Sequence, residues 1–265
     1  MTDTSRVRGL FFDLDGTLLS GNTRRIPDSA LYAISRARAH GMSVFIATGR
    51  HFLSLRPIAD LSFDGYVCLN GQHCVVDGGT IFSNPISRED VAVMIGFLNS
   101  NPYVCHWLGE TDCFTNRTDP VIREIFDGLG IPPFPVVDLG SALEMDVLQF
   151  ELFVRDDRLA DELVAKMPGC CWSRWHTAGI DILRSGGGKW MGIEEMMSFF
   201  GLSCEEVMVF GDADNDVEML ENSMFSVALG NGTPAAKAAA KYVADDLEND
   251  GLKKAMAELL PQLGL

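Results

Sequence analysis

Two aspartates that directly follow an apolar run constrain this chain more than any other feature. Residues 10–12 are a short hydrophobic segment, as expected for the end of a strand that is buried on both faces. Asp13 and Asp15 follow, and Gly16 then allows a backbone turn that a side chain would hinder. Two carboxylates this close repel each other unless a cation lies between them. The stretch therefore predicts a site for Mg²⁺, which binds carboxylates and keeps positions for water and phosphate. An acidic turn after a strand is the simpler alternative.

Length and charge bound the class of protein. The chain of 265 residues is long enough for one large domain or two modest ones, and its 47% hydrophobic content indicates a globular fold. The formal net charge of −16 argues against general nucleic-acid binding and against docking on an anionic membrane surface. An acidic enzyme can still bind an anionic substrate where a metal ion and a few cations are close to it.

The chain shows neither an apolar signal segment nor an apolar run of membrane-spanning length. Its 7 cysteines are odd in number and scattered, without a C-x-x-C pair. This usage favours reduced thiols over a disulfide framework or a zinc site. We therefore expect a cytoplasmic protein.

Strands and helices alternate in the first part of the chain, as in α/β folds. A helix is predicted over 28–40, between the strand at 10–12 and a second strand at 42–47. Such a unit makes the two strands parallel. A third strand is predicted at 65–69, before the turn Asn70-Gly71.

In open α/β sheets, binding sites lie at the carboxyl ends of the strands. Asp13, Thr48 and Asn70 each follow a predicted strand, so we expect them along one edge of the sheet.

The pattern changes between residues 85 and 183, where we expect an α+β insertion with helices on one face of a sheet. Residues 147–154 alternate apolar and polar side chains, which is typical of a half-solvated strand. The same region contains predicted helices and a predicted hairpin: 87–99, 119–129 and 157–167 for the helices, and 103–116 for the hairpin.

The α/β pattern resumes after residue 184. Lys189 opens a predicted helix behind three glycines, and a buried strand at 206–210 leads into Asp212, Asp214 and Asp216. The glycine run is not a P-loop, because Leu183 and Trp190 stand where that motif needs Gly and Ser or Thr. The acidic cluster is not an EF-hand loop, because its sixth and twelfth positions are Val217 and Ser223. Taken alone, Lys189 would be a solvated helix residue.

Together these motifs resemble the haloacid dehalogenase-like (HAD) superfamily, specifically its Cof-type phosphatases. The resemblance rests on the order and spacing of five short motifs over nearly the whole chain: Phe12-Asp13-Leu14-Asp15-Gly16-Thr17, Thr48-Gly49-Arg50, Asn70-Gly71, Lys189 and Gly211-Asp212-x-x-Asn215-Asp216. Trp190 departs from the glycine that commonly follows the motif lysine. The family implies an α/β fold with a Rossmann-like doubly wound parallel core, residues 1–84 and 184–265. It also implies an inserted α+β cap domain, residues 85–183, that sets substrate specificity.

The resemblance also implies roles for these residues. Asp13 would be the nucleophile that forms an aspartyl-phosphate, and Asp15 would be the general acid and base. Mg²⁺ would be held by Asp13, the backbone carbonyl of Asp15 and Asp212, with Asp216 binding through water or orienting its neighbours. Thr48 and Lys189 would hold the phosphoryl oxygens, and Asn215 would position Lys189 or the phosphate. Three further residues complete the predicted substrate-binding set: Gly49, and Arg50 and Asn70 at the rim of the site.

The implied activity is hydrolysis of a small phosphorylated metabolite, either a sugar phosphate or a phosphorylated cofactor. A phosphomutase and a non-catalytic phosphate-binding regulatory protein are the alternatives on the same scaffold. The sequence does not indicate an oligomeric state. Polar and aromatic residues of the insertion are candidate substrate contacts, although packing is the more common role of such residues: Trp107, Trp172, Arg174, His176 and Asp181.

Overall fold

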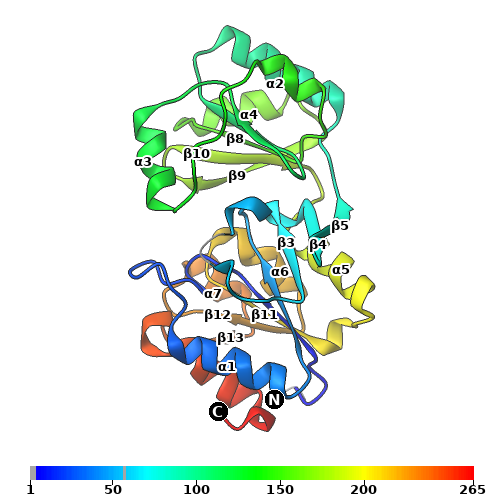
Figure 1. Ribbon diagram of the computed structural model, residues 1–265, viewed down its shortest axis with the longest axis vertical. Coiled ribbons are helices and arrows are strands. Elements are labelled where there is room, and N and C mark those ends of the chain that lie inside the picture. The colour runs from blue at the N-terminus through cyan, green and yellow to red at the C-terminus, as the bar shows by residue number, and fades with distance from the viewer. Residues whose placement is uncertain (1–3, 56–57) are drawn as a thin grey trace. The chain divides into compact units, whose positions relative to one another are not determined.

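The computed structural model describes residues 4–55 and 58–265, which form two compact units (Figure 1). The main unit comprises residues 4–50, 58–81 and 188–265, and the inserted unit comprises 51–55 and 82–187. The predicted cap boundaries were residues 85 and 183, so the inserted unit reaches a few residues further at each end. It also includes a short segment that directly follows Arg50.

The main unit is built on an eight-stranded sheet with the order β13-β12-β11-β1-β2-β3-β4-β5. The strands from β13 to β3 run parallel, and β4 pairs antiparallel with β3. The strand bounds are β1 Gly9–Phe12, β2 Ser43–Ala47, β3 Gly65–Cys68, β4 His73–Val76, β5 Gly79–Ser83, β11 Val207–Gly211, β12 Phe225–Ala228 and β13 Tyr242–Val243.

Helices cover this sheet in two groups. α1 packs beside α8, while α5 packs beside α6 and α6 beside α7. Strands β1 and β11 are completely buried, as strands covered on both faces must be. The predicted α/β fold with a doubly wound parallel core is thus confirmed. The helix bounds are α1 Asp28–Ala39, α5 Lys189–Phe200, α6 Val217–Asn222, α7 Pro234–Ala239 and α8 Gly251–Leu259.

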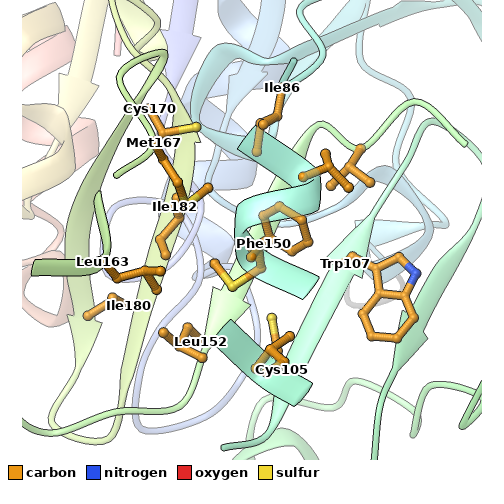
Figure 2. Close-up of a cluster of buried hydrophobic side chains, with 14 of the residues drawn as sticks. Ile86, Cys105, Trp107, Phe150, Leu152, Leu163, Met167, Cys170, Ile180 and Ile182 are labelled. Atoms are coloured by element: carbon orange, nitrogen blue, oxygen red, sulfur yellow. The ribbon is translucent and has the colours of Figure 1, made fainter. Parts of the chain in front are cut away.

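The inserted unit is an antiparallel five-stranded sheet with the order β7-β6-β8-β10-β9. Its main core contains Phe150 and Leu152 of β8 together with Met94 of α2 and Leu163 of α4. Figure 2 shows Phe150, Leu152 and Leu163 in this core. The element bounds are α2 Arg88–Ser100, β6 Cys105–Leu108, β7 Cys113–Thr115, α3 Pro120–Gly128, β8 Gln149–Leu152, α4 Asp157–Val164, β9 Cys170–His176 and β10 Gly179–Arg184.

Two predictions about this sheet were wrong. The segment 147–154 is not half-solvated, and helices do not lie on one face alone. Phe153 points away from the main core into a second cluster with Phe126 of α3 and with Val104. Because successive side chains of a strand face opposite sides, α3 covers the face that α2 and α4 leave open. The alternating pattern was misleading because this central strand is buried on both sides.

Among the helices of the described residues, none is both long and apolar enough to cross a membrane.

Candidate active site

The site lies where β1, β2 and β11 end side by side. Phe12 pairs in register with Ile46 of β2 and with Phe210 of β11. The residues that follow these strands, Asp13 and Asp212 among them, therefore emerge at one edge of the sheet. Parallel pairing of three buried strands thus gathers motifs that are far apart along the chain.

Lys189 is buried between two aspartates. Its Nζ donates to Asp13 Oδ1 and to Asp216 Oδ1, each at 2.6 Å. The lysine side chain is 0% exposed, and Asp13 and Asp216 are 7% and 0% exposed. A buried cation needs compensating carboxylates, so the three residues form one electrostatic unit. Alone, Lys189 would have been expected in solvent, and only the tertiary structure places it here.

The turn at Asn70-Gly71 supports the loop that carries Lys189. Gly71 has φ +93°, and a Cβ there would lie 1.9 Å from the carbonyl oxygen of Gly188. Only glycine permits both this backbone conformation and this approach. The predicted turn after β3 therefore has a packing role, because it lets the residue before Lys189 come close.

Three carboxylates, of Asp13, Asp212 and Asp216, have ligand atoms within 4.8 Å of one another. Carboxylate oxygens are the donors that Mg²⁺ prefers, so this group fits the predicted metal site. Asp15 was predicted to contribute its backbone carbonyl, and its carboxylate lies elsewhere, on Arg50. Asp216 has both oxygens engaged, because Oδ2 accepts from the amides of Asp212 and Ala213. It therefore orients Lys189 and the following turn.

Burial and mutual repulsion shift the titration of this group. Burial is the largest cause that raises the pKa of Asp13 well above its ordinary value, although Lys189 opposes it. Burial also raises the pKa of Asp212 to about 6, against a hydrogen bond from Thr17. For Lys189, burial acts to lower the pKa, but Asp13 and Asp216 outweigh it and raise the pKa above its ordinary value. One lysine does not neutralise three acids, so the group favours a further cation.

Two residues without a predicted role contact the turn of Gly16 and the carboxylate of Asp212. The hydroxyl of Thr17 donates to Asp212 Oδ1 at 2.6 Å, and Asn231 donates to the carbonyl of Gly16 at 2.8 Å. Gly16 has φ +93°, and a Cβ there would lie 2.3 Å from Asp212 Oδ2. Thr17 belongs to the first motif and could have been proposed from it. Asn231 lies between two glycines after β12, a weaker signal.

Arg50 holds Asp15 in a two-pronged salt bridge. Its Nε donates to Asp15 Oδ2 at 2.6 Å, and a terminal nitrogen donates to Oδ1 at 2.7 Å. The arginine side chain is 6% exposed, whereas that of Asp15 is 40% exposed. Paired parallel hydrogen bonds fix the orientation of a carboxylate as well as its charge. The structure thus makes Arg50 the partner of Asp15, a contact that the motifs alone did not reveal.

The remaining predicted residues of the main unit lie at the same edge. Thr48 is buried, and its Oγ1 accepts from the backbone amide of Arg50 at 3.1 Å. Asn215 donates to Asn70 Oδ1 at 2.9 Å. A Cβ at Gly49 would lie 3.1 Å from that same Asn70 oxygen. Asn215 was expected to position Lys189 or the phosphate, and its recorded partner is Asn70.

The candidate contacts of the insertion have structural partners. Trp107 is fully buried in the main core of the inserted unit. Trp172 donates to Asp161 at 3.0 Å, and Arg174 pairs with Asp157 at 2.6 Å. His176 accepts from the amide of Ala178, and Asp181 is buried on β10. The structure does not gather these five residues into one cluster.

Comparisons with known proteins agree with the geometry. The family model described as haloacid dehalogenase-like hydrolase matches residues 10–256. The chain is 30% identical to the pyridoxal phosphate phosphatase YbhA of Escherichia coli K12, over 94% of this chain and 96% of that protein. It is 26% identical to the 5-amino-6-(5-phospho-D-ribitylamino)uracil phosphatase YbjI of the same organism, over 96% of each. The solved structure of the HAD subclass IIB sugar phosphatase BT4131 matches with a TM-score of 0.90 and 34% identity, over 95% of this chain and 98% of that one.

Proposed function

This chain belongs to the haloacid dehalogenase-like hydrolase family and is a phosphoric monoester hydrolase. We propose that it hydrolyses small phosphorylated metabolites with Mg²⁺, through an aspartyl-phosphate on Asp13. The observation that carries this proposal is the buried contact of Asp13 with Lys189, beside two further carboxylates. We include a cytoplasmic location, in line with seven cysteines that form no disulfide among the described residues.

The nucleophile is the Asp13 oxygen that Lys189 does not bind, Oδ2. Its attack on phosphorus forms an Asp13–phosphorus bond and breaks the bond to the leaving oxygen. Burial raises the pKa of Asp13, so nearby positive charge is needed to keep it ionised. Asp13, Asp212 and the backbone carbonyl of Asp15 would hold Mg²⁺, which neutralises carboxylate and phosphoryl charge when bound. Lys189 contributes a second, permanent positive charge.

Asp15 moves the proton in both halves of the reaction. It donates a proton to the leaving oxygen, and then accepts one from the water that attacks the aspartyl-phosphate. The water releases inorganic phosphate and regenerates the Asp13 carboxylate. Arg50 holds both oxygens of Asp15, while the exposure of this side chain keeps it accessible to leaving group and water. Thr48 supplies a hydroxyl, and Asn70 and Asn215 supply amides, for phosphoryl oxygens at the same edge.

The test is phosphate release from an aryl phosphate and a panel of phosphorylated metabolites, with Mg²⁺ or with EDTA. We expect metal-dependent release, and we expect Asp13→Asn to lower it by about 10³-fold or more because the nucleophile is lost. Asp127→Asn removes an acid on α3 that pairs with Arg123 in solvent, and serves as the matched control. A folded wild-type protein that binds Mg²⁺ and releases no phosphate would contradict the proposal. Transfer of the phosphoryl group to a second hydroxyl would instead indicate a phosphomutase.

A further inference from the structure

The inserted unit contains a cavity of about 200 Å³ that the proposed chemistry does not use. Its floor is formed by His106 of β6 and Thr115 of β7, which lie directly opposite each other in the antiparallel pair. Its walls come from Ile122 and Phe126 of α3 and from Phe134. The cavity lies on the face of the sheet that α3 covers, whereas the main core lies on the opposite face. Its lining is mainly apolar and aromatic, with a histidine in the floor.

His106 is held in one orientation by its neighbours. Its Nδ1 lies 2.8 Å from Glu151 Oε2, and its side chain is 8% exposed. Phe126 and Phe134 each meet the imidazole edge to face, with ring centroids 4.9 Å apart. An imidazole enclosed in this way cannot turn freely, so its two nitrogens have fixed and different surroundings.

Glu151 determines which nitrogen carries the proton. A carboxylate can only accept, so Nδ1 must be the donor in this pair. In the neutral imidazole, Nε2 then carries the lone pair. Within the described part of the chain Nε2 has no hydrogen-bond partner, and the ring lines the cavity. Because the ring lines the cavity, a ligand that brings a donor can reach this lone pair.

The charged groups around the cavity do not call for a charged ligand. Asp119 caps α3 by accepting from the amides of Val121 and Ile122. Arg123 pairs with Asp127, and Arg117 donates to the carbonyl of Pro102. The volume exceeds the ~150 Å³ of an engineered apolar cavity that holds benzene, so a ring with one or two substituents fits.

We propose that this cavity binds a flat aromatic or heteroaromatic ring whose hydroxyl or amino group donates a hydrogen bond to Nε2 of His106. Phe126 and Phe134 supply the edge and face contacts that such a ring prefers. Two sources share this chemistry. The ring is either the leaving group of the phosphorylated substrate, which rests on the proposed function, or a separate molecule that the inserted unit binds for itself.

Binding is measured by fluorine NMR titration of the intact chain with 4-fluorophenol and 4-fluoroanisole, which differ in the hydroxyl donor. We expect wild type to bind the phenol about 3- to 10-fold more tightly, the factor that one hydrogen bond supplies. The Nε2 signal of His106 should shift with the phenol alone. Equal affinity for the two compounds, or no binding of either, would overturn the proposal.

Variants locate the site. The His106→Asn variant keeps an amide donor for Glu151 but has no Nε2. We therefore expect this variant to bind the phenol only as tightly as the anisole. His40→Asn changes an exposed histidine after α1 and is the matched control. It should leave the affinities for both compounds unchanged. Phe134→Ala should weaken the binding of both compounds because an aromatic wall of the cavity is lost. If the His106→Asn variant does not fold, the ratio of the wild-type affinities for the two compounds and the affinities of Phe134→Ala still test the proposal.

Kinetics with 4-fluorophenyl phosphate distinguish the sources. Competitive inhibition by 4-fluorophenol, with a KM that His106→Asn raises and a kcat that it leaves similar, would identify the ring as the leaving group. Binding of the phenol without inhibition would identify a separate ligand. Ring binding in a protein that releases no phosphate would contradict the proposed function while the cavity proposal stands.

Discussion

The two units bury polar groups in different ways. The main unit buries a lysine and two carboxylates in mutual contact at the carboxyl ends of parallel strands. The inserted unit buries one His106–Glu151 pair among aromatic side chains on an antiparallel sheet. The first arrangement concentrates negative charge that a bound metal ion would balance. The second offers shape and a single hydrogen-bonding nitrogen, so the difference suggests phosphoryl chemistry in one unit and ring recognition in the other.

Lys189→Met breaks the charge balance of the main unit and should have the largest effect on stability. Asp13 and Asp216 would lose their buried cation, which typically costs about 3–5 kcal/mol of unfolding free energy. Phosphate release should disappear as well. Lys254→Met removes an exposed lysine paired with Asp245 and should leave both properties unchanged. Denaturant unfolding and phosphate release measure the two effects; a wild-type unfolding free energy in Lys189→Met would show that the buried ion pair contributes nothing.

Met94→Ala tests whether the inserted unit contributes stability without chemistry. Met94 is fully buried in the core between α2 and the sheet, and its truncation should cost about 2–5 kcal/mol. Release of phosphate from a small aryl phosphate well below the melting temperature should persist. Met224→Ala, at an exposed methionine of the main unit, is the control. Loss of turnover in a folded Met94→Ala protein would contradict this separation of roles.

Arg50→Lys separates charge from geometry at Asp15. A lysine keeps the positive charge but cannot reproduce the two parallel hydrogen bonds. We expect kcat to fall by about 10- to 100-fold, a part of what general acid–base catalysis contributes, and the pH profile to change shape. Arg36→Lys is the matched control, because Arg36 donates twice to the carbonyl of Leu263 in the same unit. An unchanged pH profile in Arg50→Lys would show that Arg50 does not position Asp15.

Asp212 makes the stability of the metal-free protein depend on pH. Its pKa is raised from 3.8 to about 6, so the folded state binds more protons than the unfolded state between these values. The free energy of unfolding should therefore fall by about 1–3 kcal/mol as the pH rises through this window. Asp212→Asn removes the effect and, in EDTA, should be more stable than wild type at pH 7 but not at pH 4. Melting curves at both pH values measure the difference; a parallel pH dependence of the two proteins would contradict it.

The inserted unit was the harder part to predict. The alternation in residues 147–154 indicated a solvated face, because a pattern of polarity cannot show that α3 packs there. The pairing of His106 with Glu151 joins two strands 45 residues apart, and nothing local marks it. Thr17 could have been proposed from the sequence, since it is the last residue of the first motif. The contacts of Arg50 with Asp15 and of Asn215 with Asn70 depend on the approach of separate loops.

The sequence by itself determined the doubly wound fold, the family and the placement of Asp13, Thr48 and Asn70 at one edge of the sheet. It could do so because buried strands, tight turns and paired acids are local patterns that leave a trace in neighbouring positions. Only the tertiary structure decided which groups touch: Lys189 between two aspartates, Arg50 on Asp15, and His106 in an aromatic cavity. Such contacts arise from strand register and from helices packing across the sheet, so residues far apart in the chain meet without any local signal.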